Sequence, residues 1–183
     1  MIFTSTIVTV TNSFCPPNVV SCSLNDLINN FILAGESCTQ INDVGTGCAL
    51  NAYDNRTQQS ITLCENKTYT ALVSSLYSTS ERVAIWIDFN NNFVFEPSEM
   101  VASRMLNGTL NTPVTITIPS AGSGGFLGVH RMRVSLAYLY VPDPCSLSPI
   151  VYGETHDYTV NIIGYIGKIF SFAKLGIAQN EFL

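Results

Sequence analysis

Charge is scarce in this chain, and most of it is negative. Only 11% of the 183 residues are Asp, Glu, Lys or Arg, and the formal net charge is −5. A face that binds nucleic acid needs clustered Lys and Arg, but the chain has eight basic residues, of which Arg131 and Arg133 come nearest to a cluster. The composition therefore excludes a nucleic-acid partner. The two arginines are expected to be solvated or salt-bridged, on a surface made polar mainly by Ser, Thr and Asn.

Catalytic motifs are missing as well. The chain contains no Gly-x-Ser-x-Gly elbow and no His-Glu-x-x-His. Its histidines are His130 and His156, and although His156 precedes Asp157, neighbours on a strand point to opposite faces and make a poor dyad. The carboxylates of Glu96 and Glu99 are typical of a solvated turn. We therefore expect a protein that is not an enzyme.

A membrane-spanning helix is excluded, because no segment reaches the ~18 uninterrupted apolar residues that such a helix needs. Residues 1–12 do not resemble a secretory signal, since they have no basic start and Thr interrupts each apolar run. We expect the chain to be the mature or visible part of a longer secreted protein.

The cysteines are even in number, and their spacing does not fit a zinc knuckle or ribbon. An oxidising compartment and three disulfides among the six cysteines are therefore expected. Any bridge from Cys145 must close a long loop, because the other five lie within the first 64 residues. The predicted disulfide residues are Cys15, Cys22, Cys38, Cys48, Cys64 and Cys145.

Short β-prone segments separated by turn signals dominate the sequence. The run 114–118 alternates strictly, so one of its faces should be buried, whereas the run 83–87 is apolar throughout and suits a central strand covered on both faces. Such a pattern predicts an all-β protein, an antiparallel β-sandwich of jelly-roll or immunoglobulin-like type. Strands are predicted at 59–63, 69–76, 82–89, 100–105, 113–118, 131–139 and 157–163.

The two ends of the chain differ from this pattern. Residues 2–11 are mostly β-branched and predict one long strand, and residues 164–183 form an apolar tail that contains Gly167 and Gly176. The expected organisation is a strand arm at 1–12, a sandwich domain at 13–163 and a tail at 164–183. Residues 23–35 are ambiguous, because their apolar residues follow helical spacing between Ser23 and Gly35.

Oxygen-bearing side chains recur at alternate positions in the segment that follows residue 87. Asp88, Asn90 and Asn92 precede Glu99, and several converging oxygens are what calcium requires. The alternative is a turn in which the Asn side chains bind their own backbone. The candidate calcium ligands are Asp88, Asn90, Asn92 and Glu99, with Glu154 and Asp157 as the expected additions.

Carbohydrate is suggested in two further ways. Asn55, Asn66 and Asn107 each begin an Asn-x-Thr sequon in a predicted turn, so N-linked glycans are expected in a eukaryotic secretory setting. A shallow face for surface glycans could be lined by aromatic residues, although aromatics on strands are more often core and cross-strand pairs. The aromatic candidates are Trp86, Tyr138, Tyr140 and Tyr152.

A resemblance to a known family rests on several short motifs, with the signature Gly-Glu-Thr-His-Asp at 153–157 foremost. The chain resembles the GEVED family over about residues 15–163; the family motif reads Gly-Glu-Val-Glu-Asp. The resemblance implies a β-rich secreted or cell-surface module without catalytic residues, and it favours a strand in 23–35. Phe93 stands where the family commonly has Gly, and Asn92 where it commonly has Asp. The other matching motifs are 86–90, 97–99, 131–134 and 144–145.

The segments that the resemblance leaves uncovered suggest how the protein works. An extended apolar terminus can complete a neighbour's sheet, and head-to-tail contacts of this kind form fibres. We therefore expect a non-enzymatic structural protomer of an extracellular filament, a homo-oligomer or polymer assembled by terminal strand exchange. The alternative is a calcium-dependent adhesion module or carbohydrate-binding module of a larger secreted protein.

Overall fold

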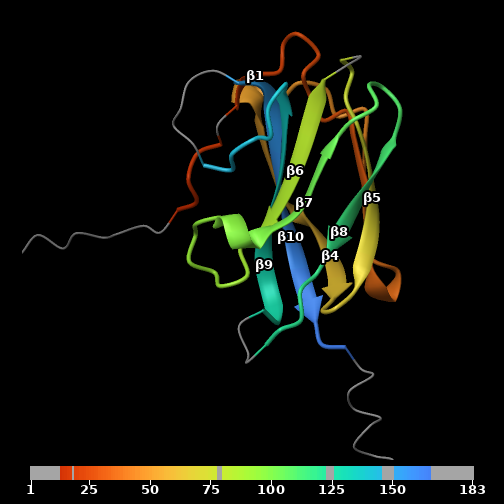
Figure 1. Ribbon diagram of the computed structural model, residues 1–183, viewed down its shortest axis with the longest axis vertical. Coiled ribbons are helices and arrows are strands. Elements are labelled where there is room, and N and C mark those ends of the chain that lie inside the picture. The colour runs from red at the N-terminus through yellow and green to blue at the C-terminus, as the bar shows by residue number, and fades with distance from the viewer. Residues whose placement is uncertain (1–12, 18, 78–79, 123–125, 146–150, 166–183) are drawn as a thin grey trace, which may run out of the picture.

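Ten strands form two stacked β-sheets in a computed structural model that describes residues 13–17, 19–77, 80–122, 126–145 and 151–165 (Figure 1). They are β1 (Val19–Ser21), β2 (Asn30–Ala34), β3 (Gln40–Val44), β4 (Tyr53–Cys64), β5 (Thr68–Ser74), β6 (Glu81–Ile87), β7 (Met100–Met105), β8 (Thr112–Thr117), β9 (Gly128–Tyr138) and β10 (Val151–Ile163). Three short 3₁₀ turns accompany them: η1 (Glu36–Cys38), η2 (Leu50–Ala52) and η3 (Pro97–Glu99). The predicted all-β sandwich is confirmed.

Strand pairing is mixed rather than wholly antiparallel. The larger sheet has the order β1-β10-β9-β6-β7, with β4 also paired to β10, and the smaller sheet has the order β3-β2-β5-β8. Strand β10 runs parallel to both β1 and β4, which corrects the expectation of a purely antiparallel sandwich. Parallel neighbours need a long crossover connection, and the chain between β4 and β10 provides one. Alternation of side chains carries no information about such pairing.

Side-chain alternation accounts for the strands that were predicted. In β8 the side chains of Thr112, Val114 and Ile116 are buried and their neighbours are exposed. In β6 both faces are covered, because Val83 and Ile85 belong to the core between the sheets while Trp86 packs on the opposite, outer face. Both patterns agree with the sequence.

Residues 23–35 are a strand only in part. Strand β2 begins at Asn30, and the residues before it form a loop in which Leu27 packs with Cys22 and Ala52. Helical spacing arose because this loop and the following strand both send apolar side chains inward. Strand β3 was not predicted. Its two buried side chains are Ile41 and the acidic Asp43, and a buried acidic residue, here paired with Arg56, breaks the apolar alternation that indicates a strand.

Disulfides join distant parts of the chain. Cys15 is bonded to Cys145, 130 positions away, and Cys22 is bonded to Cys48. In the entropic view, the longer loop is worth about 4–5 kcal/mol. The expected third bridge is not formed: Cys38 and Cys64 carry free thiols, the first exposed at the end of η1 and the second buried at the end of β4.

Several expectations lie outside the described residues. The predicted arm at 2–11 and the tail after residue 165 are among them. Within the part of the chain that is described, no helix has the length and apolar character needed to cross a membrane.

Candidate ligand-binding site

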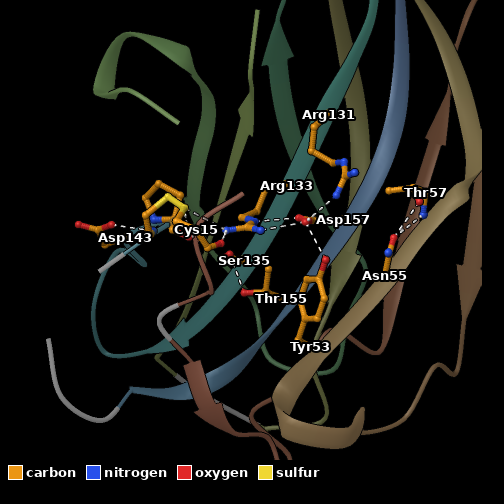
Figure 2. Close-up of polar contacts among 12 residues, drawn as sticks. Cys15, Tyr53, Asn55, Thr57, Arg131, Arg133, Ser135, Asp143, Thr155 and Asp157 are labelled. Atoms are coloured by element: carbon orange, nitrogen blue, oxygen red, sulfur yellow. Dashed lines mark hydrogen bonds and ion pairs between the residues drawn. A yellow bond between two sulfur atoms is a disulfide. The ribbon is translucent and has the colours of Figure 1, made fainter. Parts of the chain in front are cut away.

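The outer face of the larger sheet carries a buried polar network centred on Asp157 (Figure 2). Even-numbered residues of β9, such as Met132, enter the core, so the odd-numbered Arg131 and Arg133 face outward. Asp157 lies opposite Arg133 on β10. Its Oδ1 accepts a hydrogen bond from Arg133 Nε at 2.8 Å, and its Oδ2 accepts bonds from Arg133 Nη2 at 2.8 Å and Tyr53 Oη at 2.9 Å.

Arg133 is a buried anchor whose donors are largely used. Its Nη1 donates to the carbonyl oxygens of Cys15 and Pro144, at 2.9 and 2.7 Å, and its Cζ lies 4.8 Å from the centre of the Phe95 ring. Its side chain is 1% exposed. This one residue therefore ties the sheet to both segments that flank the Cys15–Cys145 bridge.

Arg131 is held differently. Its Nη1 lies 3.2 Å from Asp157 Oδ2, its Cζ lies 4.7 Å from the centre of the Phe14 ring, and its side chain is 25% exposed. Tyr53 adds a hydroxyl group whose pKa is raised to about 12, by burial first and then by the Asp157 charge. That hydroxyl therefore remains a hydrogen-bond donor across the physiological range.

Two cavities flank Phe14, whose ring contacts those of Phe93 and Phe95 in the loop between β6 and β7. The chain segment around residues 13–17 lies beside this loop (Figure 1). Their volumes are about 450 and 240 Å³, and Phe14, Phe93 and Arg131 line both. The larger one lies within the size range of ligand sites, and its mixture of apolar walls with a few polar groups is typical of them. We use the name Phe14 site for the surface formed by Phe14, Phe93, Arg131, Arg133 and Tyr53.

Phe93 occupies this site in a strained conformation. Its φ is 70°, a left-handed backbone that costs a non-glycine residue about 1–2 kcal/mol. The loop fixes it there, because its backbone N–H donates to Asp88 Oδ2 at 3.0 Å, and its ring centre then lies 5.2 Å from that of Phe14. Nine other non-glycine residues of the described chain, among them Ala52 and Leu139, also have positive φ, so it is the place of the Phe93 ring beside Phe14, more than the strain itself, that draws attention to this position.

The Asp88 loop is a turn closed by its own side chains. Asp88 is buried, and its carboxylate accepts the N–H groups of Asn92 and Phe93. Glu99 accepts those of Phe89 and Glu96, and burial raises its pKa to about 7, with help from the neighbouring Glu96 carboxylate. This is the alternative that the Asn spacing allowed.

The remaining calcium candidates are divided between the Asp88 loop and β10. Asn90 and Asn92 do lie in the Asp88 loop, where each accepts a backbone N–H within it. Glu154 and Asp157 differ by an odd number of positions on one strand, so they face opposite sides of the sheet. Asp157 is bound by arginines, as above. No group of three or more His, Cys, Asp or Glu side chains able to hold a metal ion occurs in the described part of the chain. Calcium binding at this loop stays a prediction.

The residues of the signature at 153–157 have a structural role. A side chain at Gly153 would bring a Cβ to 2.0 Å from the carbonyl oxygen of Leu136, so only glycine fits. Glu154 is buried and accepts the N–H groups of Ile28 at 2.9 Å and Ala49 at 2.7 Å. The signature therefore joins β10 to β9, to the early loops and, through Asp157, to the Phe14 site.

The predicted glycosylation and aromatic residues are placed as follows. The side chains of Asn55, Asn66 and Asn107 are all exposed, but Asn55 lies in β4 rather than in a turn. Tyr138 and Tyr152 do line a small cavity of about 130 Å³. The other two aromatic candidates are not among its lining residues: Tyr140 is 67% exposed, and Trp86 is buried with Phe95.

Sequence reasoning predicted that the two arginines are solvated or salt-bridged, and it identified neither them nor Phe14, Phe93 and Tyr53 as parts of one site. The single usable signal was Phe93, which replaces a residue that is commonly glycine in the family resembled. Phe14 and Tyr53 are brought there by chain segments distant in sequence, so no local pattern could have found them.

The fold is that of a β-sandwich module, and two cavities lie on the outer face of its larger sheet. Residues 82–161 match the family model of the GEVED domain, which confirms the resemblance over this part of the chain, including β6, the Asp88 loop, β9 and the signature. Residues 15–81 lie outside the match. No curated protein matches the chain.

Proposed function

We propose that this chain is a non-catalytic extracellular recognition module that binds carbohydrate at the Phe14 site. The observation that carries the proposal is Phe93, which is kept in a strained backbone conformation while its ring, with Phe14, lines both cavities. Aromatic rings offer flat apolar faces to the C–H groups of a sugar ring, and Arg131 offers donors to its oxygens. The two disulfides are compatible with an extracellular location.

Glycan-array binding followed by calorimetry would test the proposal. Replacing Phe93 with Gly removes the ring but suits the left-handed backbone, so the variant should fold and lose at least about tenfold in affinity. Phe93→Ala removes the same ring and keeps the strain, so it should be less stable than Phe93→Gly by about 1 kcal/mol. Tyr140→Ala is the matched control, because Tyr140 is 67% exposed and lies away from the residues lining the Phe14 site.

Two results would contradict the proposal. The first is a wild-type chain that binds no glycan. The second is a Phe93→Gly variant that folds and binds as the wild type does, which would remove the Phe14 site from the function.

Filament formation by strand exchange is the second candidate. Among the described strands, β3 and β8 form the edges of the smaller sheet, and a sheet edge can accept an added strand through backbone hydrogen bonds. The β-branched residues 2–11 are a suitable donor in sequence. Size-exclusion chromatography and negative-stain microscopy of the chain with and without residues 1–12 should show assemblies that disappear on truncation. A monomer in both cases would contradict this candidate.

A further inference from the structure

The charge of the larger cavity is positive. Its described lining residues include Arg131 and Arg133 and no Asp or Glu. Asp157 lies behind the arginines and is fully buried, so one carboxylate faces two guanidinium groups and leaves a formal charge of about +1 at this place. A neutral ligand would leave that charge unbalanced.

The two arginines do not contribute equally to this excess positive charge. Arg133 uses Nε, Nη1 and Nη2 in bonds of 2.7–2.9 Å to Asp157, Cys15 and Pro144. In the described part of the chain, one longer bond of 3.2 Å engages the Arg131 guanidinium, which has five N–H donors. Phe14 covers one face of the Arg131 guanidinium. A ligand would therefore approach the edge of the guanidinium, in its plane.

We infer that the ligand of the Phe14 site is an acidic sugar, such as a uronic acid unit, and that Arg131 binds its carboxylate. The inference rests on the proposed carbohydrate function. A guanidinium presents its N–H groups as a planar fork that matches the two oxygens of a carboxylate. The ring of the same sugar then lies against Phe14 or Phe93, and one negative charge balances the site. Arg131 is therefore a specificity-determining residue, whereas Arg133 is an anchor.

Oligogalacturonate and the same oligosaccharide with its carboxyl groups reduced to primary alcohols are the decisive pair of probes. They share linkages and ring shape and differ in charge. Wild-type chain, measured by calorimetry at low salt, should bind the acidic form about ten- to a hundredfold more tightly. That preference should weaken as salt is added, since the contact is partly exposed.

Variants at Arg131 then assign the preference to one side chain. Arg131→Gln should bind both probes equally, and Arg131→Lys, which keeps the charge without the fork, should retain only part of the preference. Arg104→Gln is the matched control, because Arg104 is exposed on β7 and does not line either cavity. Thermal unfolding of each variant verifies that it is folded.

The outcomes separate the two proposals. Equal binding of both probes by the wild type, or an Arg131→Gln variant that keeps the preference, overturns the inference and leaves carbohydrate binding standing. Equal affinity for the carboxyl-reduced oligosaccharide after sulfation of its hydroxyl groups, which restores the negative charge without a carboxylate, overturns the assignment to a carboxylate. Absence of binding to any glycan overturns the proposed function itself.

Discussion

The carboxyl groups of Asp157 and Glu81 are both without solvent exposure, but they differ in their hydrogen-bond donors. Asp157, on the outer face, accepts hydrogen bonds from two arginines and a tyrosine. Glu81, at the start of β6, accepts no hydrogen bond from the described residues, and its pKa is raised to about 9, by burial first and then by the neighbouring Asp26. A buried carboxyl group is thus either fully supplied with donors or kept neutral.

The largest loss of stability is expected from removing the charge of Asp157. Asp157→Asn leaves the buried Arg133 without its anionic partner, and uncompensated buried charges cost about 3–5 kcal/mol. Denaturant unfolding should show a loss of that size. The matched control is Asp54→Asn, since Asp54 pairs with Arg56 at the surface and is 37% exposed; it should cost less than about 1 kcal/mol. Equal losses in the two variants would contradict the assignment.

The second prediction concerns Glu81, the carboxyl group that accepts no hydrogen bond from the described residues. Because the pKa of Glu81 is about 9 in the folded protein and about 4.5, its ordinary value, in the unfolded chain, the folded protein keeps this proton to a higher pH. The folded state binds more protons between these values, so the free energy of unfolding should fall as pH rises from about 4.5 to 9.

Glu81→Gln should remove most of this slope. Thermal unfolding at pH 5 and pH 8.5 would show it, with the variant gaining stability relative to wild type by about 1–3 kcal/mol at the higher pH. Glu36→Gln serves as a comparison, because the pKa of Glu36 is lowered, chiefly by hydrogen bonds from Tyr69 and Lys67. An unchanged slope in Glu81→Gln would assign the pH dependence to other groups.

The smallest effect is expected at Asp88, which is buried like the other two but supplied by backbone N–H groups. Because those donors already satisfy the carboxylate, removing calcium with a chelator should shift the melting temperature by less than about 1 °C. Differential scanning calorimetry with calcium and with chelator would measure it. A rise of several degrees with calcium, lost in Asp88→Asn, would instead establish the calcium site.

How far the sequence reaches depends on whether a feature is local. The alternation in β8 and the apolar run in β6 are local, and both were read correctly. The odd spacing of Glu154 and Asp157 was equally local, and it places their side chains on opposite faces of β10. Other features depend on contacts between segments that are distant in sequence. They are the parallel pairing of β10 with β4, the choice of cysteine partners and the approach of Phe14 to Phe93. Those contacts create the Phe14 site, so the site was found only in part.

The Cys15–Cys145 bridge has a mechanical consequence. Tension applied to the ends of the chain follows the covalent path through Cys15, the sulfur–sulfur bond and Cys145, so it cannot extend the residues between them, which include β1 to β9. Of the strands, only β10 lies on the loaded path. Under load, a module of this kind would extend by the length of the segment that contains β10, and Phe14, which precedes Cys15, would itself lie on the loaded path.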